Sequence, residues 1–223
     1  MKKETDLAQL RQRWDEIMAP FGVDAAASDD LFADSVARYQ EPHRHYHDLG
    51  HMVHVLNTVE GMGEKAKSPT AVQLAAWFHD VIYEIGANDN EELSAQYVRN
   101  QLTPLGLPSD LIAETARLIR ATVDNSAAPD DINCQMLLDA DLSSFGFEGP
   151  AYFAGGQAIR KEFGHVPDEL FYPGRIHVLN HFLGKERLFM TQSMYTAYEE
   201  RARRNIRAEI AQIEAHIAAM NTG

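Results

Sequence analysis

Apolar residues recur at helical spacing in almost every segment of this chain, and the alternation expected of a half-buried strand is hardly visible. In residues 5–18, Leu7, Leu10 and Trp14 fall on one side of a helix. The long segment 192–219 carries an apolar stripe of the same kind. The pattern predicts an all-α protein, a bundle of about ten helices in which each helix buries one face.

Capping residues suggest where several of these helices begin and end. Ser28 is typical of an N-cap, and Ser68 followed by Pro69 is typical of a helix start. Gly61 and Gly63 are expected to end the helix that begins near residue 48. The predicted helices cover residues 5–18, 28–42, 48–62, 68–80, 90–102, 108–119, 132–144, 149–163, 167–183 and 192–219.

Composition limits the class of protein and its partners. A chain of 223 residues can bury one large core, so we expect a single domain spanning 1–223. Cys134 is the one cysteine, which excludes a disulfide framework and a cysteine-based zinc site. The formal net charge of -13 argues against nucleic acid or an anionic membrane as the main partner. With no signal core or membrane span in the sequence, we expect a cytoplasmic protein, and a homodimer is compatible with these features.

Residues able to carry chemistry are concentrated in four short stretches that lie far apart in the sequence: 46–51 (YHDLGH), 79–80 (HD), 89–91 (DNE) and 138–142 (LDADL). The pair His79-Asp80 closes the most apolar helical segment of the chain, residues 72–78. Burying an imidazole and a carboxylate there costs desolvation energy, and a bound cation would offset that cost.

The other stretches contribute similar groups. His47 and His51 are four residues apart, so on a helix they would share a face. Asp141 lies in an apolar helical segment. Imidazoles combined with carboxylates suit Mn, Fe, Co, Ni or Zn better than Ca. The same residues have simpler interpretations, because a core histidine can be hydrogen-bonded and a buried aspartate can cap a neighbouring helix.

Taken in order, His51, His79-Asp80 and Asp141 resemble the metal-binding signature of the HD-domain superfamily of metal-dependent phosphohydrolases. Residues 46–51 resemble the YHxxxH motif of class I cyclic-nucleotide phosphodiesterases, and Asp141-Leu142-Ser143 resembles their Asp-Leu-Ser. The overall pattern is most similar to a bacterial family of stand-alone predicted HD phosphohydrolases. The resemblance covers about residues 39–205.

The resemblance implies that His51, His79, Asp80 and Asp141 bind the metal, with Asp80 also serving catalysis. It favours Asp141 over Asp139 as the last ligand. His47 matches the histidine that donates a proton to the leaving oxygen. A divalent ion lowers the pKa of bound water and polarises a phosphoryl oxygen, and a histidine can act as general acid near neutral pH.

Further residues are candidates for binding the substrate. Asn90 and Glu91, with Glu84, follow the HD pair and could hold water or second-layer hydrogen bonds; they could equally be a helix cap and solvated acids. Arg160 and Arg175 lie where similar proteins carry arginines, and a guanidinium can form a bidentate pair with phosphate.

A further histidine of similar proteins is absent from residues 119–126, which read IRATVDNS. We therefore expect one tightly bound ion of Mn, Fe, Co, Ni, Zn or Mg. The predicted function is a metal-dependent phosphohydrolase, a phosphomonoesterase or phosphodiesterase, acting on a small phosphorylated molecule, with nucleotides among the candidates. The alternatives are a non-catalytic HD-fold protein that binds or senses metal or nucleotide, and a structural helical bundle.

Overall fold

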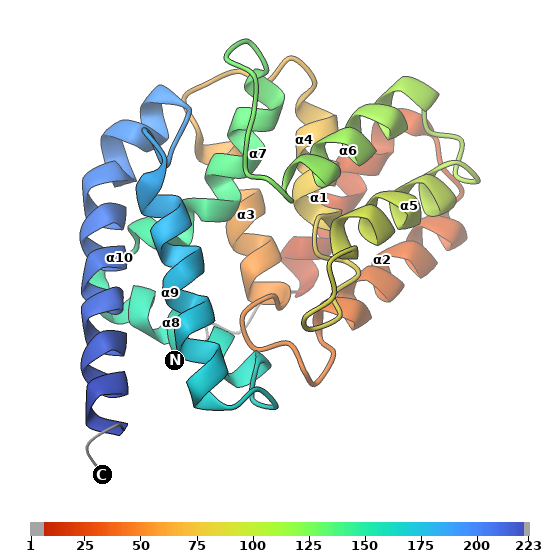
Figure 1. Ribbon diagram of the computed structural model, residues 1–223. Coiled ribbons are helices and arrows are strands. Elements are labelled where there is room, and N and C mark those ends of the chain that lie inside the picture. The colour runs from red at the N-terminus through yellow and green to blue at the C-terminus, as the bar shows by residue number, and fades with distance from the viewer. Residues whose placement is uncertain (1–6, 221–223) are drawn as a thin grey trace. The chain divides into compact units, whose positions relative to one another are not determined.

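A computed structural model describes residues 7–220, and the regular secondary structure of this part of the chain is all helical, with no β-strand (Figure 1). The all-α architecture and the expected number of helices are therefore confirmed. The helices are α1 (Leu7–Met18), η1 (Ala19–Phe21), α2 (Ala25–Tyr39), α3 (Leu49–Gly61), α4 (Pro69–Phe78), α5 (Asn90–Leu102), α6 (Ser109–Ala121), α7 (Ile132–Leu142), η2 (Ser143–Gly146), α8 (Gly149–Glu162), α9 (Asp168–Gly184) and α10 (Gln192–Met220), where η marks a 3-10 helix.

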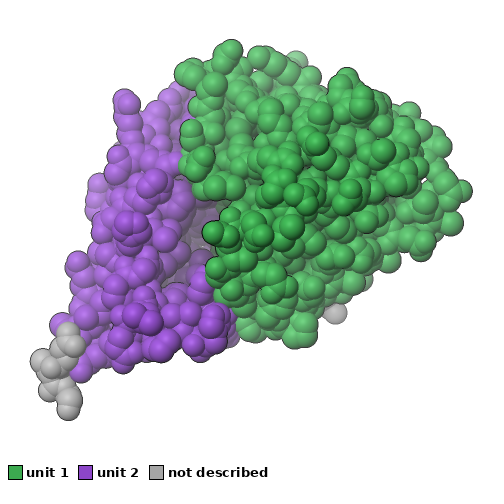
Figure 2. All heavy atoms as spheres, turned by 45° about the vertical axis from the view of Figure 1, so that its right-hand side comes forward, with its two compact units in different colours: residues 1–141 green, residues 142–223 purple. Residues whose placement is uncertain are grey.

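The chain divides into two compact units, residues 1–141 and 142–223, coloured green and purple in Figure 2. The boundary falls at the end of α7, directly after Asp141. The sequence predicted one domain over the whole chain. Because two compact units can belong to one domain or to two, that expectation stays a prediction.

The first unit is built around α4. This helix contacts α1, α3, α5 and α6, and its residues from Val72 onward are almost all buried. A helix that is apolar on every side belongs in a core, which explains why residues 72–78 lack a polar face. Trp14 of α1 lies against its C-terminal half, with ring centroids 5.0 Å from Trp77 and 5.9 Å from Phe78.

One predicted helix start is wrong. Ser28 lies inside α2 rather than at its N-cap, and the N-cap is Asp24, whose carboxylate accepts a hydrogen bond from Ala27 N. Ser28 is buried, and its hydroxyl accepts a hydrogen bond of 2.9 Å from the Trp14 indole. Serine suits a cap and a core hydrogen bond equally, so the residue type alone does not distinguish the two positions.

The second unit is organised around α10, which contacts η2, α8 and α9. Asn205 of α10 donates hydrogen bonds of 2.8 Å to the carbonyls of Phe145 and Phe147 at the end of η2. Glu199 accepts hydrogen bonds from the backbone amides of Leu188 and Phe189. These polar side chains fix the turns of the unit to its longest helix, because each satisfies backbone groups that the short helices leave unpaired.

Among residues 7–220, no helix combines the length and the apolar character required to cross a membrane.

Candidate metal centre

His51 lies in the first turn of α3. Asp48 is the N-cap of this helix, and its Oδ1 accepts hydrogen bonds from Gly50 N at 2.8 Å and from His51 N at 3.2 Å. The cap fixes the direction in which the helix starts, and therefore the direction of the His51 side chain. His51 is buried, with 8% of its surface exposed.

His79 and Asp80 follow the last turn of α4. The His79 amide donates to Ala75 O at 2.9 Å, so the backbone continues the helix to this point. The His79 ring is buried, and its Nδ1 lies 3.0 Å from Ala76 O. Since a carbonyl can only accept, Nδ1 carries the hydrogen and Nε2 presents its lone pair in the neutral ring. Metal-binding histidines in proteins commonly have this arrangement.

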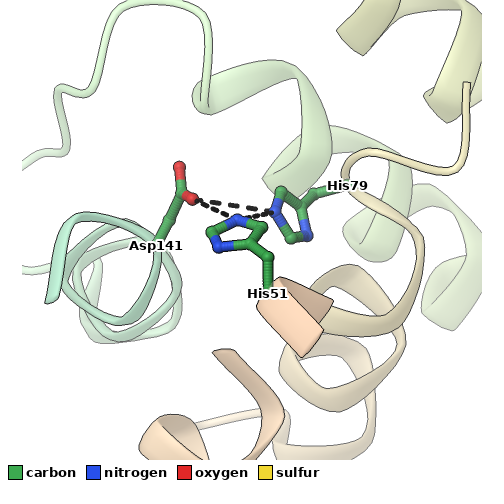
Figure 3. A group of neighbouring side chains, drawn as sticks. All are labelled: His51, His79 and Asp141. Atoms are coloured by element: carbon green, nitrogen blue, oxygen red, sulfur yellow. Dashed lines mark hydrogen bonds and ion pairs between the residues drawn. The ribbon is translucent and has the colours of Figure 1, made fainter. Parts of the chain in front are cut away.

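The two histidines meet Asp141, which comes from the end of α7 (Figure 3). The His51 and His79 Nε2 atoms are 3.2 Å apart, and Asp141 Oδ1 lies 3.1 Å from His51 Nε2 and 3.7 Å from His79 Nε2. One ligand atom from each of the three residues falls within 4.8 Å of the others. Three helices that are distant in sequence therefore direct ligand atoms to one point.

Asp80 adds a fourth group at the edge of this cluster. Its Oδ2 lies 3.1 Å from His79 Nε2 and 3.6 Å from His51 Nε2. The Asp80 side chain is 16% exposed and that of Asp141 is 21% exposed, whereas both histidines are nearly inaccessible. The imidazoles are therefore enclosed, and the carboxylates face the more accessible side. We refer to these four residues as the His/Asp cluster.

The spacing of these atoms fits a divalent ion. Two ligand atoms each about 2.1 Å from one ion, at an angle of roughly 90° to 110°, are about 3.0 to 3.4 Å apart. The His51–His79, His51–Asp141 and His79–Asp80 distances of 3.2, 3.1 and 3.1 Å fall in this range. Two neutral imidazole nitrogens and two carboxylates also supply the mixed nitrogen and oxygen set that borderline divalent metals prefer. The residues therefore fit such an ion.

The charges of the cluster depend on one another. Burial raises the pKa of the Asp80 and Asp141 carboxyls, but the neighbouring histidines outweigh it and hold both below their usual range. Burial lowers the pKa of His79, but the Asp80 carboxylate outweighs it and raises that pKa above its ordinary value. Without a metal, the cluster thus retains a proton on His79, and an ion would compete with that proton.

His47 lies beside the cluster but is not on the helix that carries His51. Helix α3 begins at Leu49, so His47 precedes it and the shared helical face with His51 is wrong. The bend before the cap brings the His47 and His51 rings to 5.8 Å all the same. The His47 ring also stacks on Tyr83 at 4.3 Å, which sets its orientation. His47 is half-buried, so solvent and a ligand could both reach it.

Arg44 has a positioning role that sequence reasoning missed. Its buried guanidinium donates to the carbonyls of Asp80 at 2.6 Å, Val81 at 3.1 Å and His47 at 3.2 Å. It also pairs with Glu41 at 2.9 Å. One side chain therefore ties the loop that carries His47 to the turn that carries Asp80. The sequence signal was a lone arginine in a histidine-rich loop, where backbone carbonyls have no helical partner.

Tyr39, at the end of α2, is a second missed residue. Its fully buried hydroxyl donates to Trp77 O at 2.8 Å and accepts from Asp80 N at 3.3 Å. Burial and the Asp80 carboxylate raise the pKa of this phenol well above its ordinary value, so it stays protonated as a donor. The hydroxyl thus supports the backbone of the HD pair directly.

The remaining candidates of the first unit lie outside the His/Asp cluster. Asn90 is buried, and its amide accepts from Glu84 N at 2.9 Å and donates to Glu84 O at 3.0 Å, so it holds the loop after the HD pair. Glu91 is half-buried in the first turn of α5. Asp139 is fully buried in α7 and is not one of the three converging residues, whereas Asp141 is.

The two candidate arginines belong to the second unit and are paired there. Arg160 bonds to Asp168 Oδ1 at 2.6 Å and to the carbonyls of Phe163 and Val166. Arg175 Nε bonds to Glu209 Oε1 at 2.8 Å. Their predicted role in binding substrate stays a prediction.

Comparison with family models, with curated proteins and with solved structures gave no match to this chain. The candidate site is therefore supported by the geometry of its own residues.

Proposed function

We propose that this protein is a metal-dependent phosphohydrolase whose ion is held by His51, His79, Asp80 and Asp141. The observation that carries the proposal is the convergence of two histidine Nε2 atoms and a carboxylate oxygen within 4.8 Å. The order of these residues along the chain also resembles the HD-domain superfamily, which supports a phosphate ester as the substrate.

Each residue has a defined part in this proposal. A divalent ion bound here would supply Lewis acidity toward water and a phosphoryl oxygen. His79, through its Nδ1 bond to Ala76 O, keeps Nε2 available as a ligand. His51 is directed by the Asp48 cap. The buried imidazoles exclude water from one side of the cluster, while Asp80 and Asp141 face the accessible side.

His47 is the proposed general acid. Its ring is close to that of His51, and its orientation is set by stacking on Tyr83. A histidine can act as a general acid near neutral pH and deliver a proton to a leaving oxygen. Arg44 acts on the same reaction as a positioning residue, because it binds the carbonyls of both His47 and Asp80.

The substrate class in this proposal is a small phosphate ester, with nucleotides among the candidates, and one ion is bound tightly. The test is hydrolysis of nucleotides and phosphomonoesters by the full chain, loaded in turn with Mn, Fe, Co, Ni, Zn and Mg. Turnover with at least one metal and about one retained equivalent after dialysis are expected. A metal-loaded protein that is inert to the whole panel would instead favour a non-catalytic binding or sensing role.

The sharpest variant is His47→Ala, with His45→Ala as the matched control because His45 is exposed on the same loop. His47→Ala should retain the ion and lose about 100-fold or more of the turnover, as expected when a general acid is removed. His45→Ala should retain both. Loss of the ion from His47→Ala would show that His47 is a ligand and would overturn its assignment as the acid.

A further inference from the structure

The second unit contains a cavity that the proposed hydrolysis does not use, although Arg160 and Arg175, the arginines predicted from the sequence to bind substrate, line it. It has a volume of about 250 Å³ and lies among α8, α9 and α10. Aromatic side chains Phe153, Phe171 and Tyr172 line it, together with the Arg175–Glu209 pair. A cavity somewhat smaller than the roughly 300 Å³ lower limit of drug-sized pockets suits a ligand with one small ring system.

The charges in and around this cavity are compensated. Arg175 Nε and Nη2 bond to the two Glu209 oxygens at 2.8 and 3.3 Å, and each of these side chains is 11% exposed. Arg160 bonds to Asp168 at 2.6 Å. A phosphate or carboxylate ligand would have to displace Glu209 or Asp168 from its arginine. The cavity therefore does not favour an anion, and an uncharged ligand avoids this cost.

The walls favour a flat ligand. The Arg160 guanidinium covers one face of the Phe171 ring at 4.6 Å, and the Tyr172 ring meets His216 edge-on at 4.8 Å, so the lining already packs planar groups against one another. Aromatic rings and arginine planes are the surfaces on which bases stack in proteins that bind single-stranded nucleic acids. Such surfaces accept any planar ring, whatever its substituents, so they select for shape.

The polar groups add a pattern of donors and acceptors. Gln157 and Gln212 are exposed amides on the lining, and each amide can both donate and accept. Glu209 also lines the cavity, but its two oxygens already accept from Arg175 and Tyr152, so it can accept from a ligand only through its remaining lone pairs. A nitrogen heterocycle presents the same alternation of donors and acceptors along its edge, which is why amide side chains pair with bases.

Gly156 keeps the carboxylate accessible from the cavity. A Cβ at this position would lie 3.5 Å from Glu209 Oε1, so any longer side chain would fill the space beside the carboxylate. Glycine in a helix interior lowers the stability of the helix. The space that Gly156 leaves beside Glu209 is a reason for a glycine at this position.

We propose that this cavity of the second unit binds the uncharged, planar, nitrogen-containing ring of a small molecule, a nucleobase or a heterocycle of that size. Binding requires neither a metal ion nor the histidines of the first unit. The inference therefore stands or falls separately from the proposed phosphohydrolase activity.

The test uses the full chain without metal and ligand-observed NMR with adenosine, guanosine, cytidine and uridine as probes. Benzoate and benzamidine serve as flat probes of opposite charge. At least one nucleoside should bind about tenfold more tightly than either charged probe. Absence of nucleoside binding at millimolar concentration, or equal binding of benzoate, would overturn the proposal.

Variants then locate the binding. Gly156→Leu should weaken nucleoside binding by about tenfold or more, while Gly174→Leu should leave it unchanged. Gly174 is the matched control because it lies in α9 and a Cβ there would meet nothing within 4 Å. Gln157→Ala, at an exposed position, gives a second variant that preserves the fold and should also weaken binding. Nucleoside binding that survives both cavity variants would place the site elsewhere and contradict the inference.

Discussion

Each unit of this protein holds carboxylates with little exposure, and the two units neutralise them differently. In the first unit, Asp80 and Asp141 face the imidazoles of His51 and His79. In the second unit, Glu209 faces the guanidinium of Arg175 and also accepts a hydrogen bond from the Tyr152 hydroxyl. An arginine is charged at every physiological pH, whereas a histidine is charged only when it holds a proton. The Glu209 site is therefore complete within the chain, and the His/Asp cluster is suited to an exchangeable cation.

The largest expected effect concerns the divalent ion proposed for the His/Asp cluster. His79→Ala or Asp141→Ala should weaken divalent metal binding about 1,000-fold or more and remove the thermal stabilisation that metal gives. At a metal concentration near 1,000 times the wild-type Kd, that stabilisation amounts to about 4 kcal/mol. Metal content after dialysis and Tm with and without metal measure the two effects.

Glu209→Gln is the matched control, because it removes a carboxylate from the second unit and leaves the His/Asp cluster intact. It should retain the wild-type metal content and the same metal-dependent rise in Tm. If Glu209→Gln lost the ion as His79→Ala does, the contrast between the two carboxylate sites would be wrong.

The next largest effect concerns Arg175, whose guanidinium neutralises Glu209 in the second unit. Arg175→Met would leave the Glu209 carboxylate, which is 11% exposed, without its guanidinium. The variant should lower the free energy of unfolding by about 3 kcal/mol, since a charge left unpaired in the interior is costly. Chemical denaturation of the metal-free protein measures it, and adding Glu209→Gln should recover most of the loss. A variant of unchanged stability that binds phosphate esters more weakly would instead support the substrate role predicted for Arg175.

The smallest expected effect concerns His54, on α3. A histidine, unlike an arginine, changes its charge with pH. Burial, with a smaller contribution from the charge of His51, lowers the pKa of His54 to about 4 from its ordinary 6.5. The folded state therefore keeps His54 neutral in a range where the unfolded chain is protonated. The stability it contributes is complete above pH 6.5 and is lost as pH falls toward 4.

Between pH 6.5 and 5, His54 should account for about 1.6 kcal/mol of lost stability, since the slope rises from about half of 1.4 kcal/mol per pH unit at pH 6.5 toward that full value at lower pH. His54→Gln should remove that part of the acid sensitivity, as followed by urea unfolding at several pH values. His177→Gln, at an exposed position of α9, is the control and should behave as the wild type does. Equal acid sensitivity in His54→Gln and wild type would contradict the assignment.

Periodicity predicted the helices well because helix burial depends on the spacing of apolar residues alone. Residues 72–78 were predicted as the most apolar helical segment, and α4 is the helix around which the first unit is packed. The placement of Ser28 was wrong because a hydroxyl that caps a helix and one that bonds to a buried indole are the same in sequence. The distinction lies in Trp14, which packs from another helix.

The residues of the candidate site were likewise predicted only in part. The histidines and aspartates that converge were predicted from their order in the chain, and His51, His79 and Asp141 do converge. The helical spacing argument for His47 was wrong because Asp48 caps α3 after it. Arg44 and Tyr39 were missed because they act on backbone carbonyl and amide groups. Backbone groups do not indicate in the sequence which side chain will bond to them, since every residue except proline carries both, so the position of Arg44 among histidines was the one signal present.

The position of Asp141 as the last residue of the first unit has a consequence for biosynthesis. Synthesis proceeds from the N-terminus, so all four residues of the His/Asp cluster are made before any residue of the second unit. Domains and compact units tend to fold in that order as the chain emerges. In the proposed function, the complete set of ligands is therefore available to the ion while the ribosome is still adding α8 to α10, and Asp141, the last residue of the first unit, completes that set.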